Sequence, residues 1–238
     1  MTFLAPRFGA LKDAPVPLMK LEYCGQKRNR RLIIFLPGID DLAEDFEKRG
    51  FIDEMRRQGI AADAIAVDAH FGYYAKRVIF DRITDDIIDS AYATGYEEIW
   101  LVGISLGGFG AVSYVARHAS PITGIVLFAP FLGDRKLIAE IADAGGLRNW
   151  EPGHVAHTDV QRSVWAWFKH HLPGMSARDA MPQVYIGYGA RDMFARANGL
   201  LAEVLPADRV FAIPGRHDWK TWVSLWRLFL AHWSKRYR

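Results

Sequence analysis

Cysteine is nearly absent from this chain of 238 residues, which contains only Cys24. A single cysteine cannot form a disulfide within the chain, so the disulfide frameworks of small secreted domains are excluded. Long apolar runs are missing too, because nowhere do about 18 uncharged apolar residues follow one another. The N-terminus has no apolar stretch of signal-peptide length, since Pro6, Pro15 and Pro17 interrupt it. We therefore expect a soluble, cytoplasmic protein that does not associate with a membrane.

The chain also has little excess charge of either sign. Lys and Arg number 30 against 27 Asp and Glu, which gives a formal net charge of +3. Seven basic and two acidic residues lie in residues 1–31, a balance of +5 that leaves −2 for the remaining 207 residues. The densest basic run, residues 27–31, contains no aromatic side chain that could stack on a base. We interpret it as a solvated turn and expect no nucleic-acid partner.

Motifs for metals and nucleotides are equally scarce. His154 and His157 lie three apart, but no cysteine accompanies them in their Gly- and Pro-rich stretch, so we expect no metal site. Residues 108–110 begin as a Gly-x-Gly phosphate loop, but the third glycine would have to stand where Ser113 is. No Gly-Lys-Ser or Gly-Lys-Thr occurs either. We expect neither a metal nor an organic cofactor.

What the chain does contain is material for a core, since 50% of its residues are hydrophobic and 13% aromatic. Short Val- and Ile-rich runs, bounded by Gly, Pro or Asp, alternate with segments of helix length. The predicted buried strands are Leu32–Leu36, Ala64–Val67, Ile99–Val102, Ile125–Phe128, Val184–Ile186 and Val210–Ile213. The predicted helices are Leu42–Gln58, Arg82–Thr94, Leu106–Arg117 and Met193–Leu205. This alternation predicts an α/β fold with a mainly parallel central sheet and helices on both faces.

Two regions depart from this alternation. Residues 1–30 precede the first strong strand and are expected to add a hairpin or an edge strand. Residues 130–182 are much longer than the other connections and predict two helices, Arg135–Ala144 and Asp159–His171. We interpret residues 131–181 as a small helical cap inserted into a single domain that spans residues 1–238.

Two of the predicted helices show further side-chain patterns. Asp41, with Glu44 three residues later, resembles a capping box that opens the helix over residues 42–58. Near the C-terminus, aromatic residues recur at steps of three and four, which places them on one helical face. These residues are Trp219, Trp222, Trp226, Phe229 and Trp233. We expect this terminal helix to face the core rather than to form a ligand-binding stripe.

One motif is typical of an enzyme active site. Residues 103–107 read Gly-Ile-Ser-Leu-Gly, a G-x-S-x-G pattern that follows the strand-like residues 98–102 and opens a helix. A serine at so sharp a strand-to-helix turn is held in strained backbone geometry, and the flanking glycines remove Cβ clashes. Its Oγ projects above the sheet, where the helix N-terminus supplies positive potential for an oxyanion. Ser105 is therefore a candidate nucleophile.

A nucleophilic serine needs a base, and the base needs an acid to orient it. Asp192 ends a Gly-Ala-Arg-Asp turn after the predicted strand Val184–Ile186, and His217 follows the strand that ends at Ile213. Both residues, like Ser105, come just after the carboxyl end of a predicted strand. Parallel sheets of α/β proteins place their active sites at this edge.

Other residues compete for these roles. Asp134 follows the predicted strand Ile125–Phe128 and is an alternative acid, although we favour Asp192 for its Gly-rich turn and its spacing to His217. Asp218 adjoins the histidine and is interpreted as a helix cap. His118 ends the helix after Ser105, where a histidine interacts favourably with the helix dipole.

These motifs make the chain resemble the α/β-hydrolase superfamily from about Leu32 to the C-terminus. The segments that carry the resemblance are Leu36–Ile39, Gly103–Gly108, Gly189–Asp192 and Pro214–Trp219. The Gly-x-Ser-x-Gly-Gly-x-Gly-Ala segment and the Gly-x-His-Asp-Trp ending look like the esterase D and feruloyl-esterase-like branch. The first strand departs from that branch, because it ends in Leu-Pro-Gly where His-Gly is common.

The resemblance implies a serine hydrolase with a catalytic triad. It assigns Ser105 as the nucleophile, His217 as the general base and then acid, and Asp192 as the partner of the histidine. The backbone N–H groups of Ile39 and Leu106 would form the oxyanion hole. The reaction would be a two-step acyl transfer to water, and it would need no cofactor.

The substrate is less defined by the sequence. His70 and Tyr73 lie in a loop at the same sheet edge, and Trp165 belongs to the aromatic-rich insertion, so these three are candidate substrate-binding residues. Each of these side chains could equally anchor its segment to the core. Of the three tryptophans of the insertion, Trp150, Trp165 and Trp167, we expect two to pack onto the core in this way. An apolar wall would suit a small or medium hydrophobic ester. A thioesterase, an acyltransferase, a peptidase and a non-catalytic binding protein remain alternatives, and the chain could form a homo-oligomer.

Overall fold

The computed structural model describes residues 13–25, 27–118, 122–171 and 182–236. Within them, seven strands form one sheet in the order β1-β3-β2-β4-β5-β6-β7. The strands are β1 (Lys20–Tyr23), β2 (Arg31–Leu36), β3 (Asp63–Val67), β4 (Glu98–Ile104), β5 (Gly124–Phe128), β6 (Gln183–Gly189) and β7 (Val210–Ile213). Only β1 is antiparallel to its neighbour, and the five other neighbouring pairs are parallel. The predicted α/β fold with a mainly parallel sheet is confirmed.

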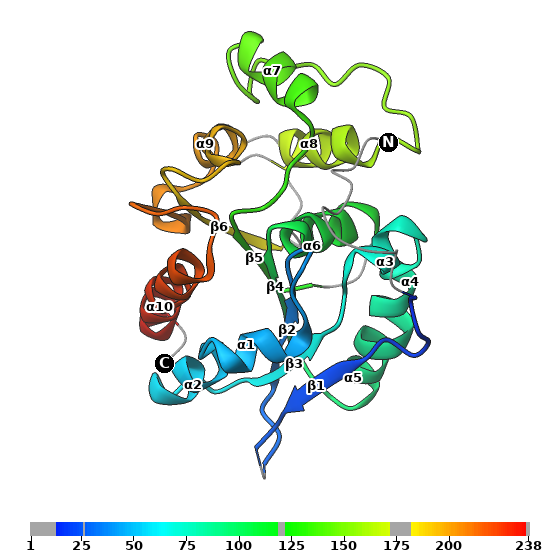
Figure 1. Cartoon of the computed structure of the whole chain (residues 1–238), viewed down its shortest axis with the longest axis vertical. Coiled ribbons are helices and arrows are strands. Elements are labelled where there is room, and N and C mark those ends of the chain that lie inside the picture. The colour runs from blue at the N-terminus through cyan, green and yellow to red at the C-terminus, as the bar shows by residue number, and fades with distance from the viewer. Residues whose placement is uncertain (1–12, 26, 119–121, 172–181, 237–238) are drawn as a thin grey trace.

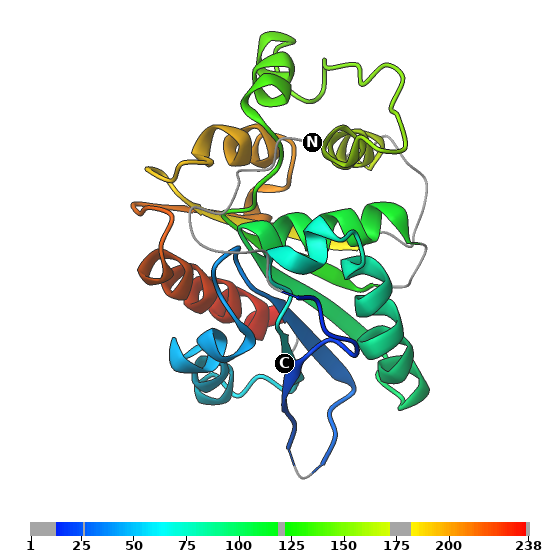
Figure 2. The same ribbon diagram turned by 45° about the vertical axis from the view of Figure 1, so that its right-hand side comes forward.

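Helices cover both faces of this sheet (Figure 1, Figure 2). In chain order the described helices are α1 (Ala43–Lys48), α2 (Phe51–Arg57), α3 (Phe71–Ala75), α4 (Ile79–Ile83), the π-helix η1 (Thr84–Ile88), α5 (Asp89–Ala93), α6 (Leu106–Arg117), α7 (Arg135–Asp143), α8 (Val160–His170), α9 (Ala195–Ala202), the 3-10 helix η2 (Ala207–Arg209) and α10 (Trp219–Arg236). Helices α1, α2 and α10 lie on one face, and α3 to α6 lie on the other.

Strand β2 shows how the sequence produces these two layers. Successive side chains of a strand point to opposite faces, so Leu32 and Ile34 pack with the α6 side while Ile33 and Phe35 pack with the α10 side. All four are fully buried. A strand covered on both faces reads as a continuous apolar run, which is why it stands out in the sequence.

The edge strand expected from residues 1–30 is β1, which pairs with β3 from Lys20 to Tyr23. Residues 1–12 of that segment lie outside the described residues. Tyr73 holds the chain before β1, because its hydroxyl donates a hydrogen bond of 2.8 Å to the Pro15 carbonyl. No helix in the described ranges is both long enough and apolar enough to cross a membrane.

The single helix predicted over residues 42–58 is wrong, since α1 and α2 are separate. Gly50 divides them with a φ of +83°, a left-handed conformation that glycine adopts without steric cost. The predicted cap also differs by one residue. The N–H of Leu42 donates to the Asp45 carboxylate at 2.9 Å, whereas the Asp41 carboxylate accepts a hydrogen bond from the Trp219 indole.

The helix predicted over residues 82–94 begins earlier and is not uniformly α-helical. It starts at Ile79, and residues Thr84–Ile88 form the π-helix η1 before α5 continues it. Ile79, Ile83 and Ile87 are four apart and buried, so the apolar face extends upstream of the predicted start. The Thr84 hydroxyl lies 3.0 Å from the Tyr114 hydroxyl of α6, a contact between elements distant in the sequence.

The long connection between β5 and β6 contains the two predicted helices, α7 and α8. Helix α7 begins at the predicted residue and ends one residue earlier, and α8 is one residue shorter at each end. Arg162 of α8 binds both carboxylate oxygens of Glu140 in α7 at 2.7 Å, and the Trp150 indole donates to the same carboxylate. Helix α8 packs on α6. Residues 172–181 of the predicted insertion lie outside the described residues, and its role as a cap stays a prediction.

The aromatic face of the terminal helix faces the core, as predicted. Trp222, Trp226, Phe229 and Trp233 are at most 5% exposed in α10. Trp226 stacks on Phe51 with ring centroids 5.3 Å apart, and its indole donates to the Phe51 carbonyl at 3.0 Å. The stripe therefore joins α10 to α2 and to the sheet.

Candidate active site

Ser105 stands at the turn between β4 and α6 in a strained conformation, with φ +52° and ψ −112°. A positive φ is costly for a residue with a Cβ and persists only where the surroundings impose it. Here the Ser105 N–H donates to the Phe128 carbonyl at 2.9 Å, and the Phe131 N–H donates to the Ser105 carbonyl at 3.0 Å. Both bonds fasten the turn to the end of β5.

The glycines around Ser105 are a steric requirement. A Cβ at Gly103 would lie 2.3 Å from the Gly107 carbonyl oxygen, and one at Gly107 would lie 2.1 Å from the Leu36 carbonyl oxygen. Neither overlap could be relieved by rotating a side chain, because the obstructing atoms belong to the backbone. The absence of side chains therefore lets the turn pack directly against the end of β2.

The three residues predicted as nucleophile, base and acid lie in one hydrogen-bonded chain. His217 Nε2 lies 2.9 Å from Ser105 Oγ, and His217 Nδ1 lies 2.8 Å from Asp192 Oδ2. The Asp192 side chain is fully buried, while that of His217 is 20% exposed. The second Asp192 oxygen accepts the Phe194 N–H at 2.8 Å, so both carboxylate oxygens have donors. This arrangement can pass the serine proton to the imidazole.

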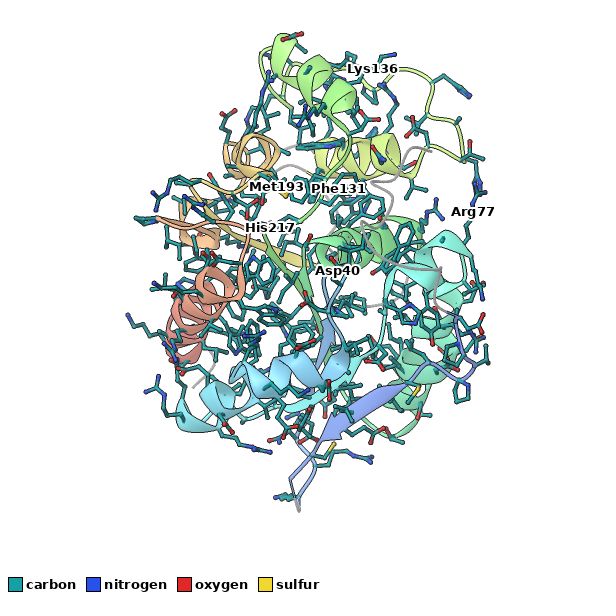
Figure 3. All side chains as sticks on the ribbon, in the orientation of Figure 1. Asp40, Arg77, Phe131, Lys136, Met193 and His217 are labelled. Carbon is teal, nitrogen blue, oxygen red and sulfur yellow. The ribbon has the colours of Figure 1, made fainter. Side chains whose placement is uncertain are left out.

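The His217 ring is held between two aromatic edges. Phe194 and Trp222 each lie 5.1 Å from it, at interplanar angles of 87° and 88°. Figure 3 shows His217, Met193 and Phe131 toward the same end of the sheet, and the Phe131 ring contacts that of Phe194 at 5.6 Å. An apolar surface therefore borders the imidazole, and Met193 on it is 68% exposed.

The two predicted oxyanion donors flank the serine. Leu106 is the first residue of α6, where backbone N–H groups have no acceptor inside the helix. Ile39 lies in the loop after β2, and this loop touches the serine, because a Cβ on Gly38 would lie 3.8 Å from the Ser105 Cβ. The arrangement places both N–H groups in segments next to Oγ, and their role as an oxyanion hole stays a prediction.

One residue of this loop was not identified from the sequence as part of the site. Asp41 Oδ1 accepts the Trp219 indole N–H at 3.0 Å, and burial raises the pKa of the Asp41 carboxyl above its ordinary value. Trp219 is two residues from His217, so the bond connects the loop after β2 to the histidine segment. No local sequence pattern predicts a contact between residues 178 positions apart.

The competing residues have other partners. Asp134 accepts the Leu137 N–H at 2.9 Å and caps α7, and Asp218 accepts both the N–H and the hydroxyl of Thr221 at the start of α10. The cap predicted at Asp218 is confirmed, and the hydrogen bonds to Thr221 lower the pKa of its carboxyl. His118 stacks on Tyr114 with ring centroids 4.3 Å apart at the end of α6.

The three candidate substrate-binding residues make contacts within the protein. The Gly72 N–H donates to His70 Nδ1 at 3.1 Å, which caps α3. The Tyr73 hydroxyl donates to Pro15, as described above, and the Trp165 indole donates to the Leu132 carbonyl at 2.6 Å. These contacts account for the burial of all three side chains, and their substrate-binding role stays a prediction.

Of the three tryptophans of the insertion, Trp150 and Trp165 are at most 2% exposed, while Trp167 is half-buried. Two of the three therefore seal the insertion onto the core, as expected. Within the part of the chain that the structure describes, no three His, Cys, Asp or Glu side chains gather as a metal site would require.

Comparisons with known proteins place this geometry in context. The family model described as "Serine aminopeptidase, S33" matches residues 27–164. Among solved structures, S-formylglutathione hydrolase from Staphylococcus aureus superposes with a TM-score of 0.61 at 12% identity, over 95% of this chain and 99% of that one. Est1E from Butyrivibrio proteoclasticus gives a TM-score of 0.58 at 16% identity, over 92% and 93%.

Monoacylglycerol lipase from Paleococcus ferrophilus gives a TM-score of 0.55 at 15% identity, over 90% of this chain and 99% of that chain. At such identities these likenesses show a shared fold. No curated protein sequence matches the chain.

Proposed function

Because the chain belongs to the serine aminopeptidase S33 family and is a serine hydrolase with an α/β-hydrolase fold, we propose that it hydrolyses carboxylic esters of small or medium acyl chain. The observation that carries this proposal is the hydrogen-bonded chain from Asp192 through His217 to Ser105, with distances of 2.8 and 2.9 Å. All three residues come from different strand ends, and a binding protein would have no use for this alignment.

In the proposed reaction, Ser105 Oγ bonds to the ester carbonyl carbon while His217 Nε2 accepts its proton. Asp192 holds the imidazole through Nδ1–H and stabilises the imidazolium that forms. The C–O bond to the leaving alcohol then breaks, and His217 returns the proton to the alcohol oxygen. A water molecule, deprotonated by His217, next attacks the acyl-serine. The bond from the acyl carbon to Ser105 Oγ then breaks, His217 returns the proton to Oγ, and the carboxylic acid leaves.

The negative charge on the carbonyl oxygen would be stabilised by the N–H groups of Leu106 and Ile39. Such donors act strongly because they are already oriented when the charge develops. The Asp41–Trp219 hydrogen bond supports this part of the proposal, since it holds the Ile39 loop against the segment that bears His217.

The preference for small or medium acyl groups rests on the surroundings of the imidazole. Phe131 and Phe194 form an aromatic pair beside His217, and the exposed Met193 extends the same apolar surface. Apolar walls with few polar groups suit hydrophobic acyl chains. A thioesterase or an acyltransferase would use the same triad, and the family description favours cleavage of an N-terminal peptide bond as the second candidate.

The test is covalent labelling followed by substrate comparison. A fluorophosphonate probe should label the wild-type protein and leave Ser105→Ala unlabelled. The wild type is then assayed on p-nitrophenyl esters of two to twelve carbons, on acyl-coenzyme A thioesters and on aminoacyl p-nitroanilides. We expect the highest kcat/KM on an ester of two to eight carbons. Faster cleavage of the anilides would favour the aminopeptidase instead, and absence of Ser105-dependent labelling would refute a serine hydrolase mechanism.

A further inference from the structure

A cavity of about 150 Å³ lies along α6, between the turn after α3 and the chain that precedes α8. The volume is well above the ~15 Å³ that one water molecule needs. Phe80 and Phe109 form part of an apolar wall, whereas Arg77 and Arg117 bring two positive charges to the same space. In Figure 3, Arg77 lies at the end of α3 on the side where the chain runs toward α8.

Within the described residues, the two arginines have no acidic partner. Neither Arg77 nor Arg117 forms an ion pair within residues 13–25, 27–118, 122–171 and 182–236. Both residues are exposed at the mouth of the cavity. Partial desolvation and, to a lesser extent, the neighbouring Arg77 charge lower the pKa of the Arg117 guanidinium. Arg77 also has a positive φ of 60°, a strained conformation for a residue with a side chain. An anion between the two would remove this repulsion.

Tyr74 lines the same cavity with the body of its side chain, while its hydroxyl is enclosed behind that wall. Tyr74 is 6% exposed, and its hydroxyl has no hydrogen-bond partner among the described residues. The group lies against the backbone of α6, because a Cβ on Gly110 would come within 2.2 Å of it. Tyr74 therefore contributes apolar surface to the cavity, and the charges come from Arg77 and Arg117.

The cavity lies beside the helix that begins just after the proposed nucleophile, and its nearest lining residue on that helix is one turn from Ser105. Phe109, which lines it, donates its N–H to the Ser105 carbonyl at 3.2 Å. From Phe109 to Arg117 the helix rises about 12 Å, at ~1.5 Å for each residue. Helical side chains lean toward the N-terminus, so Arg117 reaches back along this path, and its guanidinium lies 5.3 Å from the centre of the Phe80 ring. The walls therefore run from an apolar part near the serine to a basic end.

We propose that this cavity binds the anionic end of the substrate, so that the enzyme prefers esters whose apolar acyl chain ends in a carboxylate or a phosphate. The inference rests on the proposed ester hydrolysis at Ser105. The acyl chain would pass Phe109 and Phe80, and the terminal anion would lie between Arg77 and Arg117. The neutral alcohol part would leave from the opposite side of the serine.

The kinetic test uses esters that differ only in the terminal group. The p-nitrophenyl monoesters of adipic, suberic and sebacic acid are compared with the hexanoate, octanoate and decanoate of equal chain length. We expect kcat/KM to favour at least one anionic ester by about 10-fold or more, chiefly through a lower KM, since each charged hydrogen bond contributes a factor of this order. The preference should rise at low ionic strength.

Charge-neutralising variants test whether the two arginines cause the preference for anionic esters. Arg77→Gln and Arg117→Gln should each reduce the ratio of kcat/KM for the anionic ester to kcat/KM for the neutral ester, and the double variant should bring this ratio to about one. Arg56→Gln is the matched control, because Arg56 is an exposed arginine of α2 on the other face of the sheet. Equal kcat/KM for anionic and neutral esters, or a preference that survives the double variant, would overturn the inference while leaving ester hydrolysis intact.

A binding measurement keeps the inference testable if no ester is cleaved. Suberate and octyl phosphate should raise the Tm of the wild type and of Ser105→Ala, whereas octanol at the same concentration should not. The double arginine variant should lose this response to both anions. A response to octyl phosphate alone would assign the terminal group as phosphate, and no response to either anion would refute the site.

Discussion

The end of the sheet around Ser105 and the cavity along α6 differ in how their polar groups are satisfied. Around the serine, His217 and both Asp192 oxygens have hydrogen-bond partners, and the backbone is fastened on both sides. Along the cavity, Arg77 and Arg117 have no acidic partner within the described residues. The polar groups of the first region are paired with one another, whereas the second region has two positive charges that a bound anion would neutralise.

We expect the greatest loss of activity when the proposed acid beside His217 is changed. Asp192→Asn should lower kcat about 10⁴-fold, because an amide in place of the carboxylate favours the wrong imidazole tautomer and cannot stabilise the imidazolium. Asp134→Asn is the matched control, since Asp134 caps α7 and an asparagine can do the same. Steady-state kinetics on p-nitrophenyl butyrate measure both variants. A large loss in Asp134→Asn with little change in Asp192→Asn would exchange their roles.

A glycine substitution tests how tightly the turn around Ser105 packs against the end of β2. Gly107→Ala should lower the free energy of unfolding by about 3 kcal/mol, because the new Cβ would lie 2.1 Å from the Leu36 carbonyl oxygen and no rotamer relieves the overlap. Gly199→Ala is the control, since a Cβ there would meet only the Tyr188 hydroxyl at 3.9 Å. In the interior of α9 that change should stabilise by about 0.5 kcal/mol. Equal urea midpoints for the two variants would contradict this packing.

The insertion beside the cavity is expected to depend on pH. Hydrogen bonds from Arg162 and Trp150 lower the pKa of Glu140 from 4.5 to about 2. A depressed folded-state pKa stabilises the protein above the ordinary value, and this contribution disappears as the pH falls from 4.5 toward 2. Glu140 is partly exposed, so solvent screening reduces the effect, and Glu140→Gln should cost about 1 kcal/mol at pH 7.

The difference in unfolding free energy between the wild type and Glu140→Gln should therefore shrink steadily between pH 4.5 and pH 2. Glu44→Gln, which breaks an exposed pair with Lys48 in α1, should show little difference at any pH. A cost for Glu140→Gln that is the same at pH 7 and pH 2.5 would mean that the ion pair with Arg162 does not stabilise the insertion.

The smallest change in stability is expected in the cavity. Tyr74→Phe removes a buried hydroxyl that has no partner among the described residues, so the unfolding free energy should change by less than about 0.5 kcal/mol or rise. The same variant should keep the Tm response to suberate, because the enclosed hydroxyl does not face the cavity. A marked loss of stability without a ligand would mean that the hydroxyl already has a partner.

The two regions also differ in how far the sequence predicts them. Ser105, Asp192 and His217 follow three strand ends, and each strand is a short apolar run whose glycine-rich turn is visible in the sequence, so local patterns suffice to expect them together. The parallel sheet follows from the same alternation. The break at Gly50 and the π-helix after Ile83 were missed. A glycine inside a helical pattern does not by itself end a helix, and the apolar spacing alone does not distinguish a short π-helical stretch from an α-helix.

Long-range pairing explains the remaining omissions. Asp41 reads locally as a helix cap, yet its partner is Trp219 at the other end of the chain. Tyr74 looks like one more aromatic residue of a loop, and only its position against Gly110 of α6 shows that its hydroxyl is enclosed. Whether a polar group lacks a partner is a property of the assembled structure, so the cavity could not be read from the sequence.

An acyl-enzyme on Ser105 can be detected by trapping that intermediate. The protein is mixed with p-nitrophenyl butyrate, quenched in acid within milliseconds, digested and examined by mass spectrometry. A butyryl group should appear on the peptide that contains Ser105, in step with a burst of p-nitrophenol, and His217→Ala should abolish both. Ester turnover with no acyl group on Ser105, or with the group on another residue, would contradict the mechanism.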